Sequence, residues 1–392
     1  MNTLFIQFYT INANCLRLMN GLSDIYNHCK DMGDFIWIDT SKVKEFTFPF
    51  SKGTAYVSCV SAYELNQIYI WATIYPDIKF IIGGTAAYIY YDSDVHFPSN
   101  FILIKQTAEE YFNVPNFSCK WALDIQNINN KNSFDQLFFS YAINSTCYWN
   151  KCIFCSHGRN VIRKRKELVE LDFFDSIDFK GIKNIQFHCP APDVKLFRNY
   201  VSQFKYAPDI IYNMHLRCDD FLNPVVDDVF SNFKDQMPQF KFKIGVEFPT
   251  QRMLNYMKKG TNIETIIKTI KLLQKYPSIK VYLMFIVGWP NLIKEDIDNL
   301  KRFRDEIGIA SVHYSIVSKF RCLIDAPAYE MYKNQIDEKE VDEKESHGPF
   351  YLGYYPKMSD EAKKLNEEAE LIIGDIGVFY SGSYENSMRL RQ

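Results

Sequence analysis

Short apolar segments rich in strand-forming residues alternate with helix-like segments through most of this 392-residue chain. In the first part, the predicted strands are 3–9, 35–38, 54–60, 79–84 and 101–104, and the predicted helices are 12–31 and 63–75. Parallel strands joined by helices form an open sheet with right-handed crossovers. Such a sheet binds ligands beyond the carboxyl ends of its strands. The sequence therefore predicts an α/β protein that begins with an open parallel-sheet domain.

A second series of strands and helices follows a polar stretch. The predicted strands are 138–144, 184–188, 209–216, 241–248, 279–288 and 311–317. The predicted helices are 222–235, 250–257, 262–275, 293–306 and a terminal one over 359–373. Thr261–Glu264 resembles a helix-start box, which would place the N-cap at Thr261. Six β/α units predict a partial (β/α)6 barrel, short of the eightfold version.

These patterns divide the chain into four predicted parts. Residues 1–112 form the first domain, 113–136 a linker, 137–330 the partial barrel and 331–392 a short C-terminal extension.

Composition limits the possible functions. The formal net charge is −2, so we expect no nucleic-acid partner and no anionic membrane surface. The longest apolar run, 281–287, is far shorter than the roughly 20 residues of a membrane span. The first residues lack the basic region and apolar core of a signal peptide. The ten cysteines have no disulfide-framework spacing, so a cytoplasmic setting is expected.

Cys147, Cys152 and Cys155 form a C-x4-C-x2-C motif directly after the first predicted barrel strand. Zinc usually takes four ligands in two close pairs, and His157 is the only nearby fourth candidate. A redox pair of Cys152 and Cys155 leaves Cys147 unexplained, and chance spacing of buried cysteines is the simplest alternative. An iron–sulfur cluster of four irons normally takes four thiolates, so three leave one iron open to a small molecule. The motif favours a cluster and leaves the other three interpretations open.

The motif, with the aromatic Phe154 before its last cysteine, resembles the cluster loop of the radical SAM superfamily, where C-x3-C-x2-C is the commonest spacing. Residues 245–276 resemble the G-I-E-S…M-x-K-G-x-T segment of the branch with an N-terminal cobalamin-binding domain. Residues 281–308 resemble its F-I-x-G-x-P segment. IIGGTAAY (81–88) resembles its G-G-P-H turn, and QTAEEYF (106–112) weakly resembles its G-E-G-E end.

The resemblance covers roughly residues 1–330 and implies a Rossmann-like, cobalamin-domain-like sheet followed by a radical SAM barrel. It also implies a [4Fe-4S] cluster, S-adenosylmethionine (SAM) and cobalamin as cofactors. The cluster would cleave SAM to a 5′-deoxyadenosyl radical that abstracts hydrogen from the substrate. The expected reaction is cobalamin-dependent C-methylation of a peptide or natural product, with a flavodoxin or ferredoxin as electron donor. Two alternatives are cobalamin-independent epimerisation, cross-linking or rearrangement, and a non-catalytic metal-stabilised binding protein. A tRNA-modifying role usually requires a basic domain, which the sequence lacks.

Candidate residues follow from the resemblance, and none is assigned a catalytic role. The cluster ligands are Cys147, Cys152 and Cys155; the SAM contacts are Phe154, Gln186, His188, Arg217, Glu247, Ile286 and Val287; the cobalamin contacts are Ser61, Gly83, Gly84 and Thr85. For each SAM contact the alternative is ordinary barrel packing or a surface position, and for the glycine pair it is a tight turn.

Two departures from the family pattern bear on these assignments. The D-x-H-x-x-G motif of many cobalamin domains is absent, and Thr85 and Ala86 replace the Pro and His of the turn. Cys189, Cys218 and Cys322 have no cluster spacing, so one cluster is expected. They are interpreted as small buried hydrophobes, with a hydrogen-atom donor as the alternative.

Overall fold

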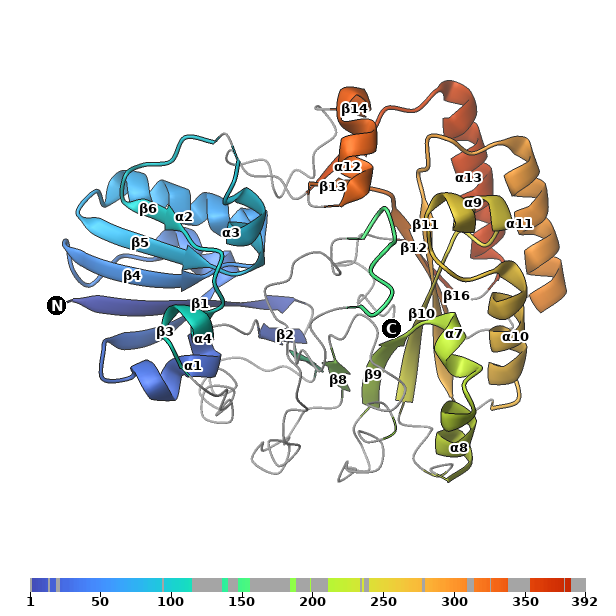
Figure 1. Ribbon diagram of the computed structural model, residues 1–392, viewed down its shortest axis with the longest axis horizontal. Coiled ribbons are helices and arrows are strands. Elements are labelled where there is room, and N and C mark those ends of the chain that lie inside the picture. The colour runs from blue at the N-terminus through green and yellow to red at the C-terminus, as the bar shows by residue number, and fades with distance from the viewer. Residues whose placement is uncertain are drawn as a thin grey trace.

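One sheet of thirteen strands runs through the computed structural model, with helices packed along it (Figure 1). The structure describes residues 2–12, 15–18, 22–93, 95–114, 136–139, 147–155, 184–187, 198, 211–232, 235, 240–276, 279–308, 314–324, 326–337, 353–376 and 378–381. No helix in this described part is long and apolar enough to cross a membrane.

The N-terminal domain is the predicted open parallel sheet. Its strands are β1 (Thr3–Asn12), β3 (Asp34–Asp39), β4 (Gly53–Ser58), β5 (Ile78–Gly83) and β6 (Phe101–Leu103). They pair in parallel in the order β3-β1-β4-β5-β6, the flavodoxin-like arrangement. The helical segments are α1 (Leu22–Cys29), η1 (Thr40–Glu45), α2 (Ala62–Ile74), α3 (Thr85–Tyr90) and α4 (Ala108–Tyr111). Apolar strand residues such as Phe8 and Phe80 share a buried core with Leu65 and Trp71 of α2.

The helix predicted over 12–31 is wrong in its first half. β2 (Cys15–Leu18) lies in that stretch, and of its described residues only Leu22–Cys29 are helical. β2 pairs antiparallel with the end of β1 and parallel with β7 (Gln136–Phe139), the first barrel strand. Pairing on two sides outweighs the local helix pattern, because strand preference depends on such neighbours.

The two halves of the molecule are also joined by side chains. Tyr9 and Trp37 of the first domain pack against the core of the barrel. Ile324, which follows the last barrel strand, packs against the core of the first domain. The continuous sheet and these contacts make one connected structure.

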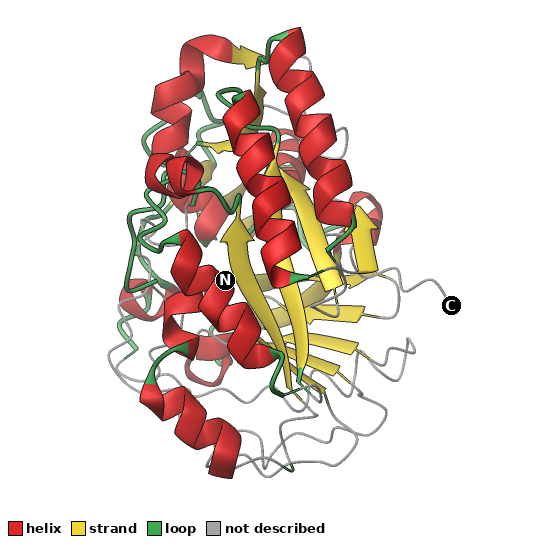
Figure 2. Ribbon diagram, turned by 90° about the vertical axis from the view of Figure 1, so that its right-hand side faces the viewer, coloured by secondary structure: helices red, strands yellow, loops and turns green. Residues whose placement is uncertain are grey.

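The second half is the predicted partial (β/α)6 barrel. After β7 come β8 (Asn184–Phe187), β9 (Ile211–Leu216), β10 (Phe240–Glu247), β11 (Lys280–Val287) and β12 (Tyr314–Lys319), each parallel to its predecessor. The described helices are α7 (Cys218–Phe221), α8 (Pro224–Asn232), α9 (Gln251–Tyr256), α10 (Ile263–Leu273) and α11 (Lys294–Ile307). They cover one face of the sheet (Figure 2). Alternate residues of β10 and β11, such as Phe242 and Leu283, are buried in the core shared with these helices.

The predicted N-cap at Thr261 is wrong by one residue. The Asn262 side chain accepts a hydrogen bond from the Thr265 N–H at 2.8 Å and caps α10. The Thr261 hydroxyl instead donates to Asp219, which ties the start of α10 to α7.

Residues beyond 330 pack on the barrel. The predicted terminal helix is α13 (Asp360–Gly374), which contacts α11, β11 and β12. β16 (Val378–Ser381), which the sequence reading missed, pairs in parallel with β12. α12 (Pro327–Tyr332) and η4 (Lys333–Gln335) precede a small antiparallel sheet of β13 (Cys322–Leu323), β14 (Ile336–Asp337) and β15 (Gly353–Pro356). The four-part division of the chain stays a prediction.

Asn366 of α13 fixes the loop that follows β11. Its side-chain oxygen accepts hydrogen bonds from the N–H groups of Gly288 and Trp289, at 2.6 and 3.0 Å. Its amide nitrogen donates to the carbonyls of Trp289 and Ala362, at 2.9 and 2.8 Å. One side chain therefore provides hydrogen-bond partners for the buried backbone groups of a turn at the carboxyl end of a barrel strand.

We expect Asn366→Ala to lower the free energy of unfolding by about 2–4 kcal/mol, because two buried N–H groups lose their acceptor. Urea denaturation measures the change. Asn232→Ala on the exposed end of α8 is the control and should cost less than about 0.5 kcal/mol. Equal losses for the two variants would show that Asn366 does not hold this loop.

Candidate active site

The three motif cysteines lie in the described segment Cys147–Cys155, on the side of the barrel that faces the N-terminal domain (Figure 1). Their thiols are free and partly exposed. Within the described residues, no group of three or more His, Cys, Asp or Glu side chains could hold one metal ion. That geometry gives no support to a zinc site built from described residues, and His157 lies outside them. Three thiolates that bind three different irons lie farther apart than the ligands of one metal ion, and a donor set of three thiols suits a four-iron cluster with one iron left open.

The turn after α9 holds the cysteine loop in place. The indole N–H of Trp149 donates to the Lys258 carbonyl at 2.7 Å, and the Ile153 N–H donates to the Met257 carbonyl at 3.0 Å. The indole occupies the space beside Gly260, where an added Cβ would lie 2.0 Å from the Trp149 ring. Gly260 also has a φ of +69°, in the left-handed region that favours glycine. Trp149 and Gly260 are far apart in the sequence, but the Trp149 ring fills the space that a side chain at Gly260 would occupy.

Arg217 supports the same loop from the end of β9. Its side chain is 6% exposed, and its Nη2 donates to the Asp219 carboxylate at 2.7 Å and to the Lys259 carbonyl at 2.9 Å. The guanidinium lies over the Tyr148 and Trp149 rings, 5.5 and 5.4 Å from their centroids. Within the described part of the chain, its Nε is a buried donor with no hydrogen-bond partner. The contacts account for Arg217 as a support of the loop and leave one donor available for a ligand.

Glu247 ends β10 in a strained backbone conformation. Its φ is +64°, and the register with β11 shifts between Gly245 and Glu247. Glu247 accepts an ion-paired hydrogen bond at 2.6 Å from Lys259 Nζ, and each residue is 8% exposed. An added Cβ on Gly245 would meet both groups, so glycine makes room for the pair on the inner face of the sheet. A bulge and a positive φ at a strand end are typical of functional sites.

The Glu247–Lys259 pair adjoins the cysteine loop. Lys259 Nζ lies 5.9 Å from the centroid of the Phe154 ring. Burial raises the pKa of the Cys152 thiol, and the nearby Lys259 ammonium opposes that rise. A cation beside the loop would stabilise thiolate ligands by the same electrostatic effect.

The structure brings several of the predicted SAM contacts to this end of the barrel. Phe154 packs edge-on against Trp289 at 6.2 Å, and the Trp289 indole N–H donates to the Ile286 carbonyl at 2.9 Å. Ile286 is half-buried and Val287 is buried in the core. The backbone of Gln186 lies in β8, but its side chain and all of His188 lie outside the described residues. The SAM contacts stay predictions, with Phe154, Arg217 and Glu247 linked through Lys259.

Ser61, Gly83, Gly84 and Thr85 lie together at the carboxyl ends of β4 and β5, and Ser61 and Gly84 each have a structural role. Ser61 caps α2, since its side chain accepts from the Glu64 N–H at 3.2 Å. Gly84 has a φ of +98°, and an added Cβ would lie 2.2 Å from the Cys59 carbonyl. Thr85 begins α3, and its side chain lies outside the described residues. The predicted cobalamin contacts form one edge, which remains a candidate.

Sequence reasoning missed three residues that build this site. They are Trp149, Lys259 and Gly260. The signal was present, because Met257-Lys258-Lys259-Gly260-Thr261 falls inside the segment that resembles M-x-K-G-x-T. The sequence could not show that this turn lies under the cysteine loop. Cys218 and Cys322 are buried and their thiols have a raised pKa of about 12, in agreement with their interpretation as small hydrophobes.

Comparison with known proteins places the fold. No family model matches this chain, and no curated protein matches its sequence. An open parallel-sheet part followed by a partial barrel is also the fold of solved radical S-adenosylmethionine enzymes that bind cobalamin. The resemblance and the fold class expected from the sequence are thereby confirmed.

Two solved structures carry this match. One is the cobalamin-dependent S-adenosylmethionine radical enzyme OxsB with aqua-cobalamin and S-adenosylmethionine bound: the TM-score is 0.64 at 13% identity over 95% of this chain. The chain spans 66% of OxsB, just under two thirds of its length. The other is the radical S-adenosylmethionine methyltransferase TsrM from Kitasatospora setae, with cobalamin and a [4Fe-4S] cluster bound: the TM-score is 0.56 at 12% identity, over 95% of this chain and 90% of TsrM.

Proposed function

We propose that this protein is a radical SAM enzyme that uses a [4Fe-4S] cluster to cleave SAM, and that its favoured reaction is cobalamin-dependent C-methylation. One observation carries the proposal. The loop of Cys147, Cys152 and Cys155 is fixed against the turn at Gly260, beside the buried Glu247–Lys259 pair at a barrel strand end. That arrangement offers thiolates and a positioned carboxylate side by side, in the fold of this enzyme class.

Each residue of the candidate site would have a separate role in binding the cluster or SAM. The three cysteines would hold three irons and leave the fourth for the amino acid end of SAM. When bound, the cluster supplies the electron that breaks a carbon–sulfur bond of SAM, and methylcobalamin supplies the methyl group. Glu247 would bind the ribose hydroxyls or the cationic centre of SAM, while Lys259 orients its carboxylate through their hydrogen bond of 2.6 Å. Phe154 and Ile286 would pack near the adenine, and buried Trp289 would help to exclude water.

Cobalamin would bind at the edge of Ser61, Gly83, Gly84 and Thr85 in the first domain. One observation favours radical chemistry without cobalamin as a second candidate. The cap at Ser61 and the close approach of Gly84 to Cys59 explain these residues without a ligand. Epimerisation, cross-linking or rearrangement would then replace methylation. In either case we propose a peptide or small natural product as substrate and a flavodoxin or ferredoxin as electron donor.

Metal loading tests the proposal. The protein is purified without oxygen and reconstituted with iron and sulfide, with and without hydroxocobalamin. We expect about four irons per chain, formation of 5′-deoxyadenosine from SAM, and retained cobalamin. Cys147→Ala should lose the cluster, whereas Cys322→Ala, a buried thiol away from the motif, should keep it.

The outcomes separate the candidates. Four irons and SAM cleavage without retained cobalamin would favour the second candidate. Zinc without iron, or tightly bound metal without SAM cleavage, would point to the metal-stabilised binding protein and overturn both radical proposals.

A further inference from the structure

The inner face of the barrel sheet, opposite the helices, carries a group of cations. Side chains alternate along β10 and β11, so the partners of the buried apolar residues point to this inner face. On β10 these are Lys241, Lys243 and Gly245, and on β11 they include Lys280 and Tyr282. All three lysines are half-buried.

Strand register brings the cations into two rows. Lys241 lies directly beside Lys280 on one side and Asn213 on the other. In the next row, Lys243 lies between His215 and Tyr282, and Tyr282 stacks on Tyr314 at a centroid distance of 4.4 Å. Every described side chain in these two rows is basic, aromatic or a neutral amide. The rows therefore form a surface that is positive and partly aromatic.

The closeness of Lys241 and Lys280 is unfavourable in the ligand-free protein. Like charges directly opposite on neighbouring strands destabilise a sheet. Among the described residues neither lysine forms an ion pair. Burial, together with the charge of Lys280, lowers the pKa of Lys241 to about 8. An anion bound between the two would remove this repulsion.

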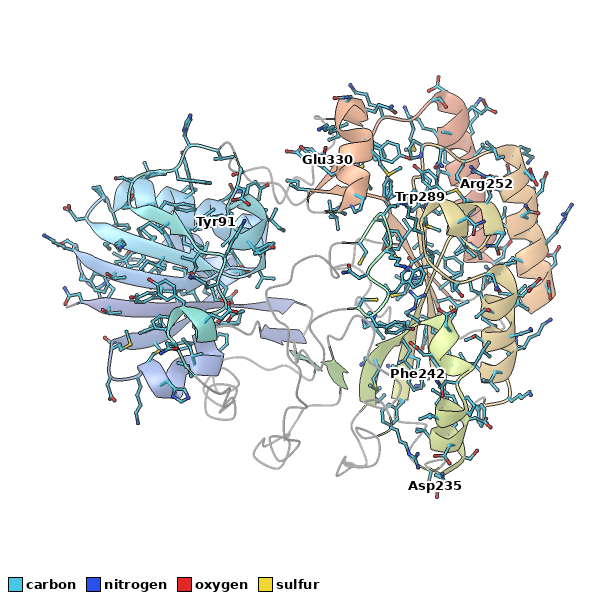
Figure 3. All side chains as sticks on the ribbon, in the orientation of Figure 1. Tyr91, Asp235, Phe242, Arg252, Trp289 and Glu330 are labelled. Atoms are coloured by element: carbon cyan, nitrogen blue, oxygen red, sulfur yellow. The ribbon has the colours of Figure 1, made fainter. Side chains whose placement is uncertain are left out.

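The rows lie within reach of the candidate active site. Gly245, beneath the Glu247–Lys259 pair, follows Lys243 by two residues and Lys241 by four on the same face of β10. At about 3.3 Å per residue, Lys241 lies roughly 13 Å along the strand from Gly245. Phe242, next to Lys241, and Trp289, beyond the end of β11, lie at opposite ends of the barrel strands in Figure 3. A substrate roughly 13 Å long would match the distance between the two ends.

We infer that the substrate carries an anionic group, a phosphate or a carboxylate, which Lys241, Lys243 and Lys280 bind on the inner face near the start of the strands. Its reacting carbon would lie toward the Glu247–Lys259 end. The role in substrate recognition rests on the proposed function, whereas the anion site itself does not.

Binding of simple anions tests the inference. Inorganic pyrophosphate and citrate are titrated calorimetrically into the full chain at constant ionic strength. The Lys241→Met/Lys280→Met variant should bind at least one probe about tenfold or more weakly, because it loses two charged donors. Lys268→Met/Lys275→Met makes the same charge change at exposed positions in and after α10 and should bind within about twofold of the parent. Stronger binding of pyrophosphate indicates a phosphate group, and stronger binding of citrate a carboxylate.

A second measurement shows that the variant is folded. Without anions, the Lys241→Met/Lys280→Met protein should unfold at the parent temperature or above it, since the repulsion is gone. Pyrophosphate or citrate should raise the unfolding temperature of the parent more than that of the variant. Equal binding by parent and variant, or no binding of either probe by the parent, would overturn the inference.

Iron loading distinguishes this inference from the proposed function. The anion titration needs no cluster. If the protein binds anions through these lysines but takes up no iron, the proposed function fails and the anion site stands. If it cleaves SAM but the lysine variant binds both probes like the parent, the proposed function stands and the inference fails.

Discussion

Gly260→Ala should abolish most of the capacity of the protein to take up iron. The added Cβ would lie 2.0 Å from the Trp149 ring, so the indole or the turn must move. Moving the indole breaks its hydrogen bond to Lys258 and displaces the loop that carries Cys147 and Cys152. We expect a loss of stability of about 2–5 kcal/mol, the sum of about 1–2 for a left-handed alanine and about 1–3 for overpacking. Iron content after anaerobic reconstitution and urea denaturation measure the two effects.

Gly308→Ala is a matched control for this change. Gly308 also has a positive φ, +84°, with a ψ of 146° that is adopted almost only by glycine, but nothing lies within 4 Å of its added Cβ. It should therefore show a backbone cost alone, about 1–3 kcal/mol, with normal iron content. If both variants lost the same stability and kept the same iron, the packing of Trp149 on Gly260 would not position the cysteine loop.

Lys259→Met should be the most damaging single loss of charge among the described ion pairs. It leaves the Glu247 carboxylate buried without its cation, which typically costs about 3–5 kcal/mol. Lys271→Met removes one partner of the exposed Lys271–Glu306 pair and should cost less than about 1 kcal/mol. Urea denaturation compares the two variants at neutral pH.

The double variant Lys259→Met/Glu247→Gln tests the cause. Glutamine keeps the shape of the side chain and removes the buried charge, so the double variant should recover much of the stability lost by Lys259→Met. SAM binding should stay impaired, because Glu247 is the proposed contact. A double variant no more stable than Lys259→Met would mean that the lysine acts through packing and not through its charge.

Regular alternation made the barrel predictable from the sequence. Polar and apolar residues alternate over 241–248, and the strand at 279–288 contains a short continuous apolar run, so the sequence shows both strands directly. The cysteine loop was equally visible because its three thiols are close in sequence. Such local features determined both the fold class and the location of the site.

Features that depend on a distant partner could not be predicted. β2 and β16 are short strands whose state is decided by the neighbours they pair with, and no local pattern names those neighbours. The need for glycine at position 260 cannot be predicted without knowing that the ring of Trp149, more than a hundred residues earlier, packs there. The bulge that turns Glu247 toward Lys259 likewise depends on the register between two strands.

The bridging strand β2 has a mechanical consequence. It pairs with β1 over four residue pairs and with β7 over four more, so the strands of the two domains form one continuous sheet. Rocking one domain away from the other would break these backbone bonds, each worth about 0.5–1.5 kcal/mol net. We therefore expect spectroscopic labels on α3 and α12 to report one fixed separation through binding and turnover. Ligands would then bind and dissociate without a hinge motion between the domains. The distance between the first-domain edge and the cysteine loop would stay constant through the reaction.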